Sequence, residues 1–168
     1  MRQWSAALIW AAIIWVLSTQ WFSDSHTATW IYPCLRWLEP GIGPDALEAT
    51  HYAIRKSAHF IEYFIFALLL YRAMRAPETR WNVRRGVISL AIAACYAGLD
   101  EAHQLFVPGR SASVWDSLLD STGALVAILV CWLWFRFKAA PLNAEAPSQT
   151  AEYPAARRPV HDQDSSTV

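Results

Sequence analysis

The sequence has little charge and no excess of either sign. Lys, Arg, Asp and Glu together make up 17% of its 168 residues, and 14 cations balance 14 acids. A net charge of zero provides no basic field of the kind that nucleic acid requires, so nucleic-acid binding is not expected. Apolar residues make up 55% of the chain, which includes ten Trp. Together with long apolar runs, this composition is typical of membrane proteins.

Cysteine is also scarce. The three cysteines, Cys34, Cys95 and Cys131, form no CxxC or Cys/His metal pattern, so a disulfide framework is not expected. Glycine-rich phosphate loops, GxSxG and HExxH are absent as well. These absences exclude the common signatures of soluble enzymes, and the sequence predicts no cofactor.

Four apolar segments are long enough to cross a bilayer. They cover about residues 4–22, 57–74, 86–107 and 114–135. These segments predict an all-α integral membrane protein with four transmembrane helices, in a domain over residues 1–138. The first segment is longer than a signal-peptide core and no cleavage site follows it, so we expect it to be retained. Residues 139–168, rich in Pro, Ala, Ser and charge, are expected to form a disordered cytoplasmic tail.

The connections contain strong turn signals. Residues 23–56 are interrupted by Pro and Gly, and their short aromatic run suits the headgroup zone or packs on helix ends. Asp45 is a candidate N-cap for a helix that continues directly into the second span. Pro108 and Gly109 predict a tight turn that makes the third and fourth spans antiparallel neighbours.

The loop after the second span predicts the orientation. Cytoplasmic loops are enriched in Lys and Arg, so this loop places both termini in the cytoplasm. We expect a multi-pass protein of the cytoplasmic membrane, with the lipid bilayer as partner and a homo-oligomer left open. The arginines that crowd the loop are Arg72, Arg75, Arg80, Arg84 and Arg85.

Ionisable residues lie within the last three spans. They are costly inside a bilayer and so predict a functional site. Helical rise places Glu62, Asp100 and Asp120 at one level, roughly 8–9 Å from the outer surface. Gly123 lies on the same face as Asp120, where it lets a neighbouring backbone come close. The residues expected to line an outward-facing cavity are Lys56, His59, Glu62, Tyr63, Asp100, Glu101, His103, Gln104, Arg110, Asp116 and Asp120.

Three motifs carry a resemblance to a known family. RKSAHFIEYF at residues 55–64, DEAHQLFVPGRSASVWDSLLDSTG at residues 100–123 and STQ at residues 18–20 resemble the VanZ-like family of bacterial membrane proteins. The resemblance implies a protein of the bacterial inner membrane and cell envelope, in a family named after a member linked to resistance to the glycopeptide teicoplanin. It assigns no reaction. Asp120 departs from the family pattern, which often has Asn there. The characteristic positions fall on Lys56, His59, Tyr63, Asp100, Glu101, Gln104, Arg110, Asp116 and Gly123.

One hypothesis is an enzyme that acts on a lipid-linked or amphipathic substrate at the outer leaflet. Asp100 or Glu101 would be general acid or base, with His59 as proton partner. Lys56 and Arg110 would hold an anionic headgroup. Acids outnumber cations here, so at least one carboxyl is expected to keep its proton near neutral pH. Further expected substrate-binding residues are Glu62, Tyr63, Gln104, Asp116 and Asp120.

The second hypothesis is a non-enzymatic protein that binds or shields an amphipathic antibiotic or envelope lipid. A proton-coupled transporter is a third, but the sequence has no internal repeat to support it. Spacing gives no specific support for a metal held by His59, Glu62, Asp100 and Asp116, so no metal is predicted.

Several of these residues also have purely structural interpretations. Asp116 lies three residues after Ser113, which fits a capping box. Arg110 could anchor to lipid phosphate, and Lys56 at a helix end could extend to the membrane surface. His103 could be an interfacial histidine without a chemical role.

Overall fold

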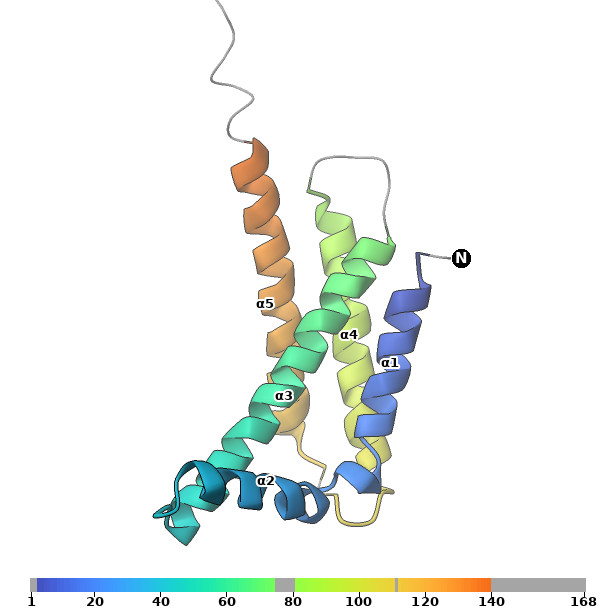
Figure 1. Ribbon diagram of the computed structural model, residues 1–168. Coiled ribbons are helices and arrows are strands. Elements are labelled where there is room, and N and C mark those ends of the chain that lie inside the picture. The colour runs from blue at the N-terminus through green and yellow to red at the C-terminus, as the bar shows by residue number, and fades with distance from the viewer. Residues whose placement is uncertain (1–2, 75–80, 111, 140–168) are drawn as a thin grey trace, which may run out of the picture.

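The computed structural model describes residues 3–74, 81–110 and 112–139, and all regular structure within them is helical. The all-α class is therefore confirmed. Four of the helices form a bundle, and α2 lies across one end of it (Figure 1). The expected tail, apart from Ala139, lies outside the described residues, as do Arg75 and Arg80. The elements are α1 (Ser5–Leu17), the 3-10 turn η1 (Gln20–Phe22), α2 (Asp24–Leu38), α3 (Pro44–Ala73), α4 (Val83–Gln104) and α5 (Val114–Ala139).

The first apolar segment is not one straight helix, contrary to the expectation for residues 4–22. α1 has 13 residues, which makes it about 20 Å long and shorter than a hydrocarbon core of about 30 Å. It ends before the polar run that begins at Ser18, and the chain then bends by 70° into the stretch formed by η1 and α2. Polar side chains at the break satisfy backbone groups there, as Thr19 does by donating to the Val16 carbonyl at 2.7 Å.

α2 forms where the sequence indicated only a broken connection. The Thr27 hydroxyl supports its first turn by donating to the Ser23 carbonyl at 3.0 Å. The same hydroxyl lies 3.1 Å from His51 Nε2, which joins α2 to α3. Trp30 and Trp37 are 78% and 81% exposed, so these two rings do not pack on helix ends. Exposed Trp rings on a helix that crosses the end of a bundle are suited to the headgroup zone.

α3 begins slightly earlier than expected. Gly43 is its N-cap and Pro44 its first residue, so Asp45 lies in the first turn and the N-cap expectation was wrong. Proline is favoured at this position because its missing N–H would have no partner in the first turn. The helix then continues unbroken to Ala73, as the sequence predicted. α4 begins with a side-chain cap, in which Asn82 Oδ1 accepts the Arg85 N–H at 3.1 Å.

The turn between α4 and α5 is confirmed. The Arg110 N–H donates to the Val107 carbonyl at 3.2 Å, which places Pro108 and Gly109 at the two central positions. Gly109 has φ +76°, a conformation that glycine adopts without the steric cost of a side chain.

At Gly123, α5 approaches the backbone of α3 closely. A Cβ atom built there would overlap the Phe60 carbonyl oxygen, so only glycine fits. This confirms the close backbone approach that the sequence predicted. Small buried side chains continue the contact, including Ala67 on α3 and Ala124 and Ala127 on α5.

By length and composition, one helix among the described residues could cross a membrane alone, α5 over Val114–Lys138. The bent pair of α1 and η1–α2 would add a second if it formed one span. α3 and α4 have 30 and 22 residues, which corresponds to about 45 and 33 Å. Both are long enough, but they contain the ionisable residues described below. The four expected spans are therefore not confirmed: among the described residues, one helix passes this test alone.

Substitution of Gly123 by Ala is expected to destabilise the fold by about 1–3 kcal/mol, because the added methyl group must displace the Phe60 backbone. Thermal unfolding of the detergent-solubilised protein measures the loss. Gly98 is a matched control within α4, since nothing lies within 4 Å of a Cβ there. Gly98→Ala should leave stability unchanged or raise it, because Ala favours a helix. Equal stability of the two variants would contradict the close approach.

Candidate functional site

Three carboxyl groups meet at the contact between α4 and α5. Asp100 and Glu101 come from α4 and Asp120 from α5, and each offers an oxygen within 4.8 Å of the others. We call these three residues the carboxylate triad. All are buried, at 1%, 7% and 0% exposure. Burying one carboxylate ion without compensation costs several kcal/mol, so this concentration is unusual for a purely structural cluster.

Hydrogen bonds satisfy the triad incompletely. Gln104 Nε2 donates to Asp100 Oδ2 at 3.0 Å, one helical turn along α4. The backbone N–H of Ser113 donates to Glu101 Oε2 at 2.7 Å. Asp120 has no hydrogen-bond partner for either oxygen among the described residues. His59 is its neighbour on α3, with Nδ1 at 3.7 Å from Asp120 Oδ1.

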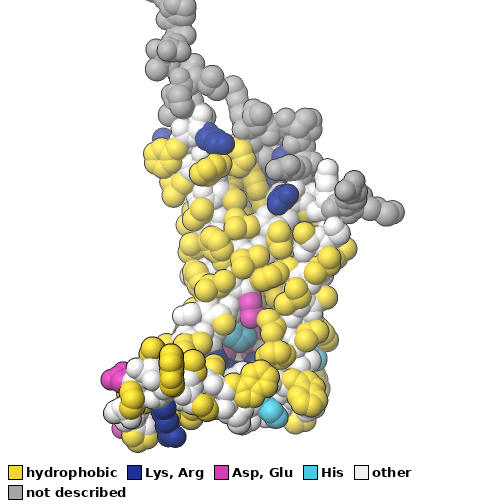
Figure 2. All heavy atoms as spheres, in the orientation of Figure 1, with side chains coloured by type: hydrophobic (Ala, Val, Ile, Leu, Met, Phe, Trp, Pro, Cys, Tyr) yellow, Lys and Arg dark blue, Asp and Glu magenta, His cyan; other side chains and the backbone are white. Residues whose placement is uncertain are grey.

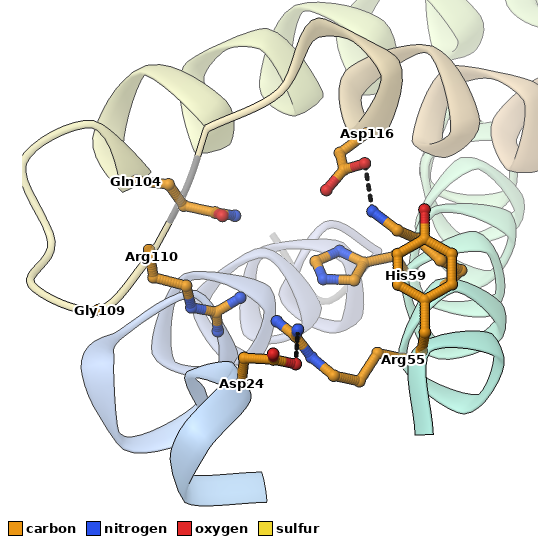
Figure 3. Close-up of a pocket in the computed structure, with 9 residues that line it drawn as sticks. Asp24, Arg55, His59, Gln104, Gly109, Arg110 and Asp116 are labelled. Atoms are coloured by element: carbon orange, nitrogen blue, oxygen red, sulfur yellow. Dashed lines mark hydrogen bonds and ion pairs between the residues drawn. The ribbon is translucent and has the colours of Figure 1, made fainter. Parts of the chain in front are cut away.

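Three basic side chains lie beside this acidic group. Lys56 of α3 forms an ion pair with Asp116 of α5. Arg55, also on α3, forms an ion pair with Asp24 at the start of α2. Figure 3 shows Arg55 and Arg110 from opposite sides of the cavity directing their guanidinium groups toward each other, with His59 nearby. Cations and acids thus occupy neighbouring halves of one site.

Arg110 connects the turn after α4 to the end of α1. Its guanidinium donates to the Leu17 carbonyl, one of the groups that a helix C-terminus leaves without an internal partner. Burial lowers the pKa of Arg110, and the neighbouring charge of Arg55 acts in the same direction. The carboxyl groups of Asp100 and Glu62 act in the opposite direction. Arginine nevertheless remains charged, because its normal pKa is so high.

Two cavities of about 180 Å³ each adjoin these residues. They share Arg55, His59 and Arg110. In Figure 2, acidic and histidine side chains are visible in a hollow of the otherwise apolar surface above α2. The polar cavity is lined by Asp24, Tyr52, Arg55, Lys56, His59, Gln104, Gly109, Arg110 and Asp116. The more apolar cavity is lined by Leu17, Phe22, Thr27, Ile31, Ile54, Arg55, Ala58, His59, Glu62 and Arg110.

The structure places six of the eleven residues that the sequence selected in the lining of these cavities, whereas the carboxylate triad lines neither of the two. The six are Lys56, His59, Glu62, Gln104, Arg110 and Asp116. Tyr63 is fully buried, and its hydroxyl has no hydrogen-bond partner among the described residues. Glu62 faces the more apolar cavity with Arg110. His103 does not line either cavity and instead stacks on Trp15, with ring centroids 4.0 Å apart.

The structure does not show two of the purely structural interpretations, the capping box at Asp116 and the extension of Lys56 to the membrane surface. The Ser113 N–H is bound by Glu101, and the Asp116 carboxylate is bound by Lys56, so these residues form no capping box. Lys56 likewise turns toward Asp116 on α5.

Sequence reasoning did not select Asp24 or Arg55 as site residues. Asp24 lies in a segment that was not expected to be helical, so nothing in the sequence placed it near α3. For Arg55 a signal existed, because His51 and Arg55 are one helical turn apart and share a face. Both contact Asp24, His51 with Nδ1 at 3.7 Å from Asp24 Oδ1.

The arrangement can hold an anion on its basic half and exchange protons on its acidic half. Arg and Lys side chains bind phosphate and carboxylate groups through charge-assisted hydrogen bonds. His59 lies between the halves, since it lines both cavities and is adjacent to Asp120. A histidine and a buried carboxyl in such proximity are suited to acid–base chemistry.

No curated protein and no solved structure matches the chain. The sequence model of the VanZ/LLP1 family matches residues 4–136. This match includes all three motifs that carry the resemblance, and it extends from the start of α1 to the last turn of α5. The chain therefore belongs to the VanZ/LLP1 family.

Proposed function

We propose that the protein acts on an anionic, amphipathic or lipid-linked substrate of the bacterial cell envelope, at the outer face of the inner membrane. The observation that carries this proposal is the pair of adjoining cavities. One is lined by Arg55, Lys56 and Arg110, and the other is lined largely by apolar side chains. A charged headgroup fits the first environment and the start of an acyl chain fits the second.

In this proposal Lys56 and Arg110 hold the headgroup, and Arg55 assists them. Asp100 or Glu101 is the general acid or base, and His59 is its proton partner. Glu62, Tyr63, Gln104, Asp116 and Asp120 complete the substrate environment. Neither cavity is lined by serine or cysteine, so attack by water is the chemistry that the residues favour.

A four-span topology with both termini in the cytoplasm would place the site on the outer side. The two ends of the bundle differ in a way that supports this orientation. The N-terminus, the end of α3 and the end of α5 lie together, opposite α2 (Figure 1). Arg72, Arg136 and Lys138 are near that end, and Lys and Arg are enriched on the cytoplasmic side of membrane proteins. α2, with its exposed Trp rings, would lie in the outer interface.

Family membership also supports a role in sensitivity to glycopeptide antibiotics such as teicoplanin. The same cavities would serve a non-enzymatic protein that binds or shields an envelope lipid or an amphipathic antibiotic. The more apolar cavity is the observation that favours this second candidate, because apolar lining with a few polar groups is typical of ligand-binding sites.

Replacement of Glu101 by Gln is expected to abolish product formation from a bacterial envelope lipid extract, because the amide cannot exchange a proton. The measurement is mass spectrometry of extracts incubated with each purified protein, scoring both bound lipids and new products. Glu48→Gln is the control, since Glu48 is an exposed carboxylate on α3. A product made by wild type and Glu48→Gln alone would support the enzyme. If wild type and Glu101→Gln retained the same lipid and neither changed it, the enzyme proposal would fail and the binding function would replace it.

The orientation predicts opposite labelling of the two ends of the bundle in spheroplasts. Cys34 is exposed on α2, so in a variant with Cys95 and Cys131 replaced by Ala it should react with a membrane-impermeant maleimide. A cysteine introduced by Lys138→Cys, with the three native cysteines replaced by Ala, should react only after the membrane is permeabilised. Protection of Cys34 together with immediate labelling at position 138 would reverse the orientation.

A further inference from the structure

We infer that the carboxylate triad binds one hard divalent cation, of the class of Ca²⁺, Mg²⁺ or Mn²⁺. Asp100 and Glu101 on α4 meet Asp120 on α5, and one oxygen from each lies within 4.8 Å of the others. Calcium–oxygen bonds measure about 2.3–2.6 Å, so two oxygens on opposite sides of one Ca²⁺ are about 5 Å apart. Three oxygens within this separation can share a single ion, and Mg²⁺ would require slightly shorter separations.

The triad retains free ligand capacity. Asp100 Oδ1, Glu101 Oε1 and both oxygens of Asp120 are buried and have no hydrogen-bond partner within the described part of the chain. Carboxylate oxygens are the ligands that hard divalent cations prefer. The hydrogen bonds from Gln104 and Ser113 each occupy the other oxygen of its carboxylate, so they orient Asp100 and Glu101 without blocking the free oxygens.

Two buried polar side chains outside the triad interact with its carboxyl groups. Tyr63 on α3 is 0% exposed, its hydroxyl has no partner among the described residues, and the carboxyl charges that act on it most strongly are those of Asp100 and Asp120. Ser18, at the end of α1, is 2% exposed, and its hydroxyl faces Asp100. Neither residue belongs to the acidic cluster. Each supplies a buried neutral oxygen next to a carboxyl of the triad, as a ligand or a partner of ion-bound water would.

The local cations do not neutralise the triad. Lys56 is paired with Asp116 and Arg55 with Asp24, while Arg110 donates to the Leu17 carbonyl. In the described residues, no Lys or Arg forms an ion pair with Asp100, Glu101 or Asp120. A bound divalent cation would supply the missing positive charge. The fold brings Asp120 to Asp100 and Glu101, although 20 positions separate Asp120 from Asp100 in the sequence.

Cation binding does not depend on the proposed substrate. With the cation bound, Asp100 and Glu101 act as its ligands. The test therefore uses direct binding and no lipid substrate, so that a failure here leaves the proposed function to be judged by its own experiment.

The experiment measures metal uptake by the full-length protein, purified in detergent and treated with EDTA. After equilibration with CaCl₂, MgCl₂ or MnCl₂ alone and gel filtration, elemental analysis gives the number of ions per chain, and a thermal unfolding series gives the shift in Tm. Wild type should retain about one ion per chain, and its Tm should rise with ion concentration, because a ligand that binds only the folded state stabilises it.

Asp120→Asn and Glu101→Gln each keep the side-chain shape and remove one ligand charge. Both should weaken binding by at least about tenfold, a loss on the scale seen when metal sites are altered. Glu48→Gln, at an exposed position on α3, should bind as wild type does. Failure of wild type to retain any of the three ions would overturn the inference. Unchanged binding by Glu101→Gln would also overturn it, which keeps the test decisive if Asp120→Asn does not fold.

Discussion

The site depends on the close contact between the backbones of α3 and α5 at Gly123. Asp120 lies one turn before Gly123 on α5, and His59 directly precedes Phe60, whose carbonyl faces Gly123. The contact therefore fixes the separation between Asp120 and His59, with 3.7 Å between their nearest polar atoms. One turn earlier on each helix, Lys56 meets Asp116. A larger residue at position 123 would move both pairs apart together, because they lie on the same two helix faces.

The ionisable residues of the site explain why a test for long, apolar helices identifies few membrane spans in this bundle. α5 satisfies this test because the stretch between Asp120 and Arg136 is uncharged and strongly apolar, whereas α4 carries two arginines near its start and the buried pair Asp100 and Glu101 near its end. Helices with ionisable groups can lie in a membrane when these groups face protein or water. Here Asp100, Glu101 and Asp120 all face the bundle interior, while apolar side chains cover the visible outer surface (Figure 2). Burial thus separates the site from the lipid-facing surface, a distinction that hydropathy alone does not make.

Local signals in the sequence predicted local features well. Pro108 and Gly109 specified their turn because Pro fixes one backbone angle and Gly permits the positive φ of the next residue. Helical spacing correctly predicted that Gln104 reaches Asp100 and that Gly123 adjoins a neighbouring backbone. The assignment of roles to these residues rests on their chemistry and remains a proposal.

The missed features depend on contacts between distant segments. The polar run that begins at Ser18 marks the end of α1, but nothing near it shows that the chain then turns across the bundle. Asp24 reaches Arg55 only because α2 forms and packs on α3. Likewise, Glu101 binds the Ser113 N–H because the turn brings the start of α5 back to α4, and the local capping box loses to this contact. Sequence spacing describes one helix at a time, whereas these interactions require the relative placement of two.

The contacts around α2 suggest how a ligand could enter without disturbing the helical core. Arg55 is bound to Asp24, whose side chain is 67% exposed, and exposed ion pairs contribute little to stability. An incoming phosphate or carboxylate could therefore replace Asp24 on Arg55 at small cost. α2 would stay attached through Thr27 and buried His51, because that contact does not involve Arg55. Lys56 is paired as well, but both it and Asp116 are mostly buried, so a headgroup held by Lys56 would join this pair between α3 and α5 without displacing Asp116.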